Sequence, residues 1–139
     1  MTNAPKAAFS LNLTWHGGER FSGPLNSGIS MSVDGTGASA PSPVQAVAFA
    51  LASCMGIDVV DIIEKGRLKV EAFSCELAVF RAEAVPKKIT GFDLNFLVKG
   101  DIPEDRVARA IELSREKYCS VWHTLHPAID FKTSFTVTP

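Results

Sequence analysis

The stretch 42–66, SPVQAVAFALASCMGIDVVDIIEKG, most constrains what this chain can fold into. Ser42 and Gln45 have the spacing of a capping box, and the proline between them stands at the first helical position, where its missing N–H costs nothing. The closing Lys-Gly pair suits a helix C-terminus. The pattern therefore predicts a helix over residues 43–65, roughly 34 Å long at 1.5 Å rise per residue.

This predicted helix is apolar or small on nearly every side between residues 44 and 57. Such a helix is expected to be buried all round, within the domain or against a second copy of it. Its apolar run is shorter than a bilayer requires and is followed by Asp58 and Asp61, so we expect no membrane span. Near its middle stands one reactive side chain, Cys54.

The totals exclude several classes of protein. A chain of 139 residues fits one domain, 1–139, with a sizeable core. Lys and Arg number 14 and Asp and Glu 15, which leaves no basic field for nucleic acid. The first residues lack the apolar segment of a signal peptide. We therefore expect a soluble cytoplasmic protein without a nucleic-acid or membrane partner, in which three cysteines do not form a structural disulfide framework.

Periodicity in the rest of the chain predicts an α+β fold. Apolar and polar residues alternate as in strands over 7–15, 20–25, 29–33, 69–81 and 89–99, and a last strand carries residues 131–137. Helical spacing covers 103–113 and 115–125. This order predicts antiparallel sheets packed on the long helix.

Cys54 and Cys119 allow two interpretations. As a redox pair, the Cys54 thiolate attacks the O–O bond of a peroxide and becomes a sulfenic acid, with which Cys119 condenses to a disulfide. Alternatively each is a small apolar core residue, because free cysteine is among the most buried residue types. Cys75 falls on the inward face of a predicted strand, and we interpret it as core filler.

A redox Cys54 needs a cation to lower its pKa. The helix N-terminus is eleven residues away, too distant to contribute, and Asp58 one turn on opposes a thiolate. Arg20, on an early predicted strand, is one candidate. The alternative is that Arg20 is an ordinary solvated strand residue.

A zinc site is a further alternative. Cys119, His123 and His126 are spaced i, i+4 and i+7, and with Cys54 they would complete a Cys2His2 set. The spacing matches no usual zinc motif, and Pro127 ends the helix. Otherwise the two histidines are surface residues near a helix C-terminus, where positive charge is favourable.

Three segments resemble the OsmC/Ohr family of thiol-dependent hydroperoxide reductases: SPVQAVAFALASC at 42–54, DVVDIIEKGR at 58–67 and LSREKYCSV at 113–121. The latter two are most similar to its OsmC-like, YhfA-type branch. The resemblance implies an intertwined homodimer in which the long helix is buried between sheets. It also implies that Cys54 is the peroxidatic and Cys119 the resolving cysteine, without metal or flavin cofactor.

The chain departs from the family pattern at one position. Many members carry a Glu directly after the proline of this helix start, where it orients the Arg that activates the thiolate. Here that position is Val44, with Gln45 next. Arg20 does not fall in a convincing copy of the Arg motif.

These observations lead to one functional prediction and two rivals. The prediction is a peroxidase that reduces organic hydroperoxides in oxidative stress defence, with a dithiol reductant such as a lipoyl group. The rivals are a non-catalytic dimer that binds a small ligand, and a zinc-stabilised structural dimer.

Overall fold

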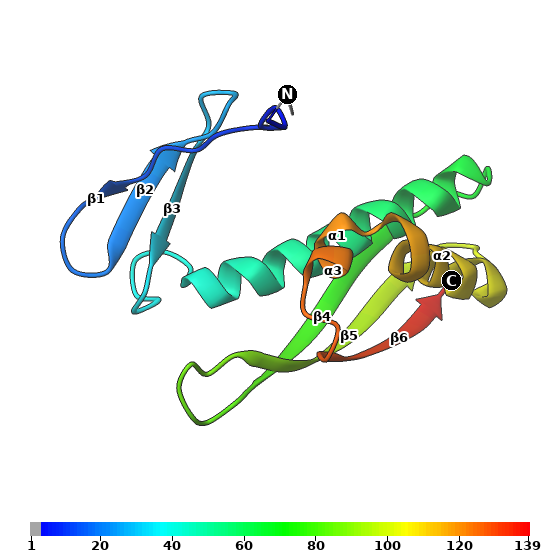
Figure 1. The fold of residues 1–139 in the computed structure, drawn as a ribbon. Helices are drawn as coiled ribbons and strands as arrows, with labels where there is room; N and C mark the ends of the chain where they lie inside the picture. The colour runs from blue at the N-terminus through cyan, green and yellow to red at the C-terminus, as the bar shows by residue number, and fades with distance from the viewer. Residues whose placement is uncertain (1–3) are drawn as a thin grey trace. The chain divides into compact units, whose positions relative to one another are not determined.

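The computed structural model describes residues 4–139, which divide into two compact units, one ending at Val47 and the other spanning Ala48–Pro139. The order of elements is β1 (Thr14–Trp15), β2 (Arg20–Pro24), β3 (Ser30–Asp34), α1 (Pro43–Lys65), β4 (Ala72–Arg81), β5 (Ile89–Lys99), α2 (Glu104–Leu113), the π-helical turn η1 (Ser114–Tyr118), α3 (Ser120–Thr124) and β6 (Asp130–Thr138) (Figure 1). The α+β class predicted from the sequence is confirmed. That the chain is one domain stays a prediction.

The first unit carries a three-stranded antiparallel sheet in the order β1-β2-β3. The predicted strand 7–15 pairs only at its end, so β1 is much shorter than the alternation indicates. Apolar side chains of the predicted strand are exposed within this unit, Trp15 at 62% and Phe9 at 64%. This sheet therefore has an apolar face but little core of its own.

The approach to α1 is organised by short-range hydrogen bonds. The Asp34 carboxylate accepts from the backbone N–H and hydroxyl of Thr36, at 2.9 and 2.7 Å, and from those of Ser39, at 3.1 and 2.7 Å. These bonds hold the pKa of Asp34 well below its usual range. The capping box is confirmed, because Gln45 N–H donates to Ser42 Oγ at 3.2 Å and Ser42 N–H to Gln45 Oε1 at 2.9 Å.

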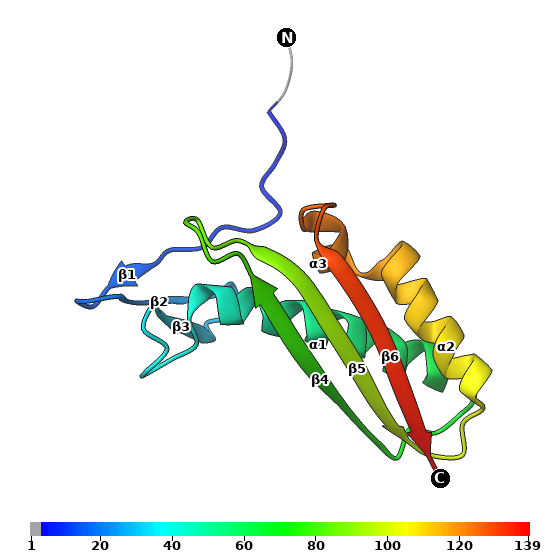
Figure 2. The ribbon, with the colours of Figure 1, turned by 90° about the horizontal axis from the view of Figure 1, so that it is seen from below.

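The second unit is a three-stranded sheet, β4-β5-β6, with helices packed on one face (Figure 2). β4 and β5 are antiparallel, as predicted, and register Leu77 against Leu94. β5 and β6 are parallel, with Phe92 opposite Phe131. The expected antiparallel pairing is therefore wrong for β6. The reason is that α2, η1 and α3 form a crossover connection, which returns the chain in its original direction.

The core of this unit lies between α1 and the inner face of the sheet. Leu51, Met55 and Val59, at successive four-residue steps of α1, are fully buried with Phe92 and other side chains of β5. On the other side of α1, Phe49 is 77% and Ile57 69% exposed. Burial on every side is therefore not achieved within the second unit by itself, and burial against a second copy stays a prediction.

By length and composition α1 could cross a membrane, since its most apolar window has a mean hydropathy of 2.0. The expectation that its apolar run is too short is therefore wrong by this measure. The same property is found in core helices of soluble proteins, and 33% of the window is buried inside the structure. One such helix is weak evidence for a membrane span.

Candidate functional site

The long helix and the crossover connection each supply one cysteine to the second unit. Cys54 is half-buried on α1. Cys119 is fully buried and sits between η1 and α3 with extended backbone, φ −72° and ψ 98°. A continuous helix over 115–125, as the sequence predicts, is therefore wrong. The Cys119 N–H bonds to the carbonyl of Ser114, five residues back, at 2.8 Å, and this π turn ends the helix one residue before the cysteine.

The two thiols lie together. Cys54 is close enough to Cys119 for a hydrogen bond between their side chains. From the other side, the backbone N–H of Trp122 donates to the Cys119 Sγ at 3.4 Å, so this sulfur acts as the N-cap of α3. The fold therefore brings together the two cysteines that the sequence singled out, although they are far apart along the chain.

The surroundings of Cys119 favour the protonated form of its thiol. Burial raises the pKa of the Cys119 thiol to about 11, and the Trp122 N–H opposes this rise only in part. Cys54 and the carboxylate of Asp58 contribute to this rise. At neutral pH Cys119 is thus a thiol, whereas half-buried Cys54 is the member of the pair that solvent reaches.

One polar pair beside the cysteines was missed by sequence reasoning. Ser114 is fully buried, and its hydroxyl donates to Asp58 Oδ2 at 2.8 Å. Asp58 was recognised from its helical spacing as a charge near Cys54. Ser114 carries no comparable signal, because no local pattern indicates which distant carboxylate a buried hydroxyl will meet.

Arg20 belongs to the first unit, on β2. Its guanidinium donates to the carbonyl of His16 at 2.9 Å and is exposed within that unit. Its role in activating Cys54 stays a prediction. The first turn of α1 carries no acidic side chain, and Gln45 is engaged in the capping box.

The helix face required by the zinc alternative does not form. Cys119 precedes α3, and α3 ends at Thr124, so His126 lies outside the helix. There His126 Nδ1 accepts from the Ala128 N–H at 3.0 Å. Within residues 4–139 we find no group of three or more His, Cys, Asp or Glu side chains that could hold a metal ion.

Cys75 occupies the place expected of core filler. It is half-buried on β4, and burial raises the pKa of its thiol. Its Sγ faces Gly56 of α1, where it would lie 3.8 Å from an added Cβ. It therefore offers a matched thiol outside the Cys54–Cys119 pair.

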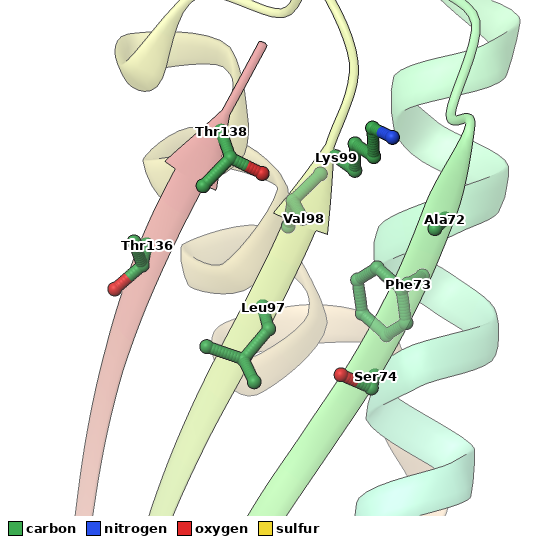
Figure 3. A pocket seen from close by; sticks show the side chains of 8 residues that line it. All are labelled: Ala72, Phe73, Ser74, Leu97, Val98, Lys99, Thr136 and Thr138. Atoms are coloured by element: carbon green, nitrogen blue, oxygen red, sulfur yellow. The ribbon is translucent and has the colours of Figure 1, made fainter.

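Two hollows of the second unit lie away from the cysteines. One, of about 200 Å³, opens at the end of the sheet where Lys99 and Thr138 meet (Figure 3). It is lined by Ala72, Phe73, Ser74, Leu97, Val98, Lys99, Thr136 and Thr138. The other, of about 480 Å³, lies between the α2–η1 segment and β6 and includes Arg115 and Phe135. Neither is lined by Cys54 or Cys119.

Residues 35–134 match the family model described as OsmC-like protein, which covers well over half of the chain. This chain belongs to the OsmC-like protein family. The OsmC-like chain is 41% identical to Protein YhfA of Escherichia coli K12 over 125 residues, covering 88% of this chain and 93% of YhfA. The predicted resemblance is therefore confirmed.

Solved structures support the same fold for this OsmC-like protein. A hypothetical protein from Aquifex aeolicus VF5 is 25% identical with a TM-score of 0.86, covering 96% of this chain and 98% of that one. An organic hydroperoxide resistance protein OsmC from Legionella pneumophila has a TM-score of 0.70 at 19% identity, covering 95% and 100%. At this identity the second likeness shows the fold alone.

Proposed function

We propose that this OsmC-like protein is a thiol-dependent peroxidase that reduces organic hydroperoxides, with H2O2 as a second substrate. The observation that carries the proposal is the contact between Cys54 and Cys119 in the second unit. Family relatives described as organic hydroperoxide resistance proteins support the substrate class. Two adjacent thiols, one reached by solvent and one buried, are the arrangement that a peroxide-driven disulfide requires.

The proposed reaction has two oxidative steps. The Cys54 thiolate attacks the terminal oxygen of the hydroperoxide, the O–O bond breaks, and the alkoxide takes a proton and leaves as the alcohol. Cys54 is then a sulfenic acid. Cys119 attacks this sulfur, the S–O bond breaks, and the thiol hydrogen leaves with the hydroxyl as water.

A dithiol completes the cycle by thiol–disulfide exchange. Its two thiols give both hydrogens and two electrons to the Cys54–Cys119 disulfide and become a disulfide themselves. A lipoyl-type dithiol fits this role, and no metal or flavin cofactor is needed. We further propose that the protein acts in the cytoplasm as a homodimer in oxidative stress defence, with Arg20 as a candidate activating cation.

The test is consumption of cumene hydroperoxide with dihydrolipoamide as reductant. We expect turnover by the wild type, loss of at least a hundredfold in Cys54→Ser, and wild-type turnover in Cys75→Ser, the matched control. Intact mass and peptide mapping after one equivalent of peroxide should show the Cys54–Cys119 disulfide. Equal inactivity of wild type and Cys54→Ser contradicts the proposal.

One observation favours the rival in which the same site binds a small ligand without catalysis. Among the described residues, the side chains that act on the Cys119 charge are a thiol and a carboxylate, with no cation. A cysteine without a positive neighbour is a weak nucleophile at neutral pH, because it stays mostly in the thiol form and the thiolate is the nucleophile. This rival predicts that Cys54 and Cys119 remain reduced thiols in the presence of excess peroxide.

A further inference from the structure

Asp58 and Ser114 make a side-chain hydrogen bond that joins α1 to the segment 114–125. Ser114 has no exposed surface, and its hydroxyl reaches Asp58 Oδ2 at 2.8 Å. Because the surroundings are apolar, a buried hydroxyl without this partner would be costly. The bond therefore fixes where the crossover segment sits along the long helix.

This hydrogen bond between Asp58 and Ser114, which we call the tether, is directly connected to both cysteines. Asp58 lies one helical turn beyond Cys54 on α1, so the two side chains share a face. Ser114 uses its carbonyl to accept the Cys119 N–H at 2.8 Å, across the π turn. The same serine thus holds the Cys119 backbone through its carbonyl and the Cys54 helix through its hydroxyl.

Asp58 also brings negative charge to a site with little to offset it. From α1, the groups that act on Cys119 are Cys54 and Asp58, and both raise the pKa of its thiol. From its own segment Cys119 receives the Trp122 N–H.

The remaining neighbours do not cancel this charge. Arg115 stacks on Phe131, with its guanidinium 4.8 Å from the ring centroid, and does not act on the Cys119 charge. The hydrophobic core that contains Cys119 includes Phe92 of β5 and Phe131 of β6, and the thiol of Cys75 on β4 packs at its margin.

We propose that Asp58 and Ser114 are positioning residues of the cysteine pair, which hold the two sulfurs in register and set the negative charge beside Cys119 as it attacks the Cys54 sulfenic acid. This inference rests on the proposed function and deepens it. In the step concerned, the S–S bond forms as the Cys54 S–O bond breaks. The Cys119 hydrogen leaves with the hydroxyl as water, one sulfur being reduced and the other oxidised by one electron.

Two variants separate the tether from the charge. Asp58→Asn keeps an oxygen that can accept from Ser114 but removes the charge. Ser114→Ala removes the tether but keeps the charge. Each is treated with one equivalent of cumene hydroperoxide from pH 7 to pH 12 and quenched with an alkylating agent at set times, and its Cys54–Cys119 disulfide is quantified by mass spectrometry.

For Asp58→Asn we expect the pH midpoint of disulfide closure to fall, because the carboxylate that disfavours the Cys119 thiolate is removed, so that closure at pH 7 is roughly threefold faster. For Ser114→Ala we expect closure roughly fivefold slower at every pH with an unchanged midpoint. A purely structural role for Asp58 would leave the midpoint where it is. Cys75→Ser is the control and should follow the wild type.

The outcomes distinguish this inference from the proposed function. If the wild type forms no Cys54–Cys119 disulfide, the proposed function fails. If it does, and Asp58→Asn keeps the wild-type midpoint or Ser114→Ala the wild-type rate, the inference is overturned. Should Asp58→Asn not fold, Asp58→Glu replaces it. This variant keeps the charge and must keep the midpoint, and a shifted midpoint would overturn the inference.

Discussion

At the scale of single residues, Cys119 has the most altered surroundings of the three cysteines. It is fully buried, its thiol faces Cys54 and Asp58, and its pKa is raised to about 11. Because burial keeps the Cys119 thiol neutral in the folded chain, the stability of the fold depends on pH. The protonated thiol is the form that the folded chain accommodates.

The free energy of unfolding is therefore expected to depend on pH through Cys119. Below about pH 8.5, the ordinary cysteine pKa, the Cys119 thiol is protonated in both the folded and the unfolded chain. In that range its contribution to the free energy of unfolding is fully present. As pH rises from there to about 11, only the unfolded chain loses the proton, so the free energy of unfolding falls by up to about 3 kcal/mol. Urea unfolding of reduced protein between pH 7.5 and 10.5 measures this loss.

Cys119→Ala is the matched reference, because it lacks the titrating thiol and keeps the other ionisable groups. The stability advantage of the wild type over this variant should shrink as pH rises. An advantage that stays constant up to pH 10.5 would show that Cys119 titrates normally.

At the scale of secondary-structure elements, the middle of α1 contains a glycine that packing tolerates and helix propensity disfavours. Gly56 is buried against β4, where an added Cβ would lie 3.4 Å from Phe73 Cε1 and 3.8 Å from Cys75 Sγ. These are ordinary contacts. Glycine within a helix costs about 0.5–1 kcal/mol relative to alanine.

Gly56→Ala should therefore raise the free energy of unfolding by up to about 1 kcal/mol, since it removes freedom from the unfolded chain without a clash. Chemical denaturation measures the change. Gly56→Leu is the contrasting variant: its larger side chain must displace Phe73 or Cys75, so it should destabilise the fold by about 1–3 kcal/mol. Destabilisation by alanine as well would mean that α1 and β4 pack more tightly than these contacts indicate.

The start of the same helix offers a second test at this scale. Ser42 and Gln45 satisfy each other's backbone N–H groups, so Ser42→Ala removes one bond of the capping box. We expect a loss of about 1 kcal/mol by thermal or urea unfolding. Ser53→Ala is a matched control, because the Ser53 hydroxyl donates to α1 carbonyls that already accept helical bonds.

At the scale of the whole molecule, apolar surface remains uncovered on each unit taken by itself. Phe49 and Ile57 are exposed on α1, at 77% and 69%, and Trp15 is exposed in the first unit. Exposed apolar patches of this kind mark interaction surfaces. They support the homodimer that we propose, in which a second copy covers α1.

Sedimentation velocity of the full chain should therefore give a dimer. Phe49→Asp with Ile57→Asp should produce a monomer, because charge on the covered face of α1 would be buried without a partner. Val85→Asp is the matched control: Val85 is 88% exposed in the loop between β4 and β5 and should leave the dimer intact. A wild type that sediments as a monomer contradicts the proposed assembly.

The features that could be predicted from the sequence are those that depend on interactions between residues close together along the chain. The start and end of α1, its capping box and the inward faces of β4 and β5 depend on residues two to four positions apart, which a sequence pattern shows directly. The family likewise follows from the sequence, because segments such as 42–54 carry the resemblance. Sequence also marked Cys54 and Cys119, but it left open whether they meet.

Tertiary structure decided what depends on contacts across the chain. The parallel pairing of β6 follows from the crossover that precedes it, and the π turn at Ser114–Tyr118 places Cys119 outside a helix where periodicity expected one. The contact between the two thiols and the bond from Ser114 to Asp58 join segments that only packing brings together. Sequence by itself determined local hydrogen bonding and chemistry, and the packed core decided which of these groups became neighbours.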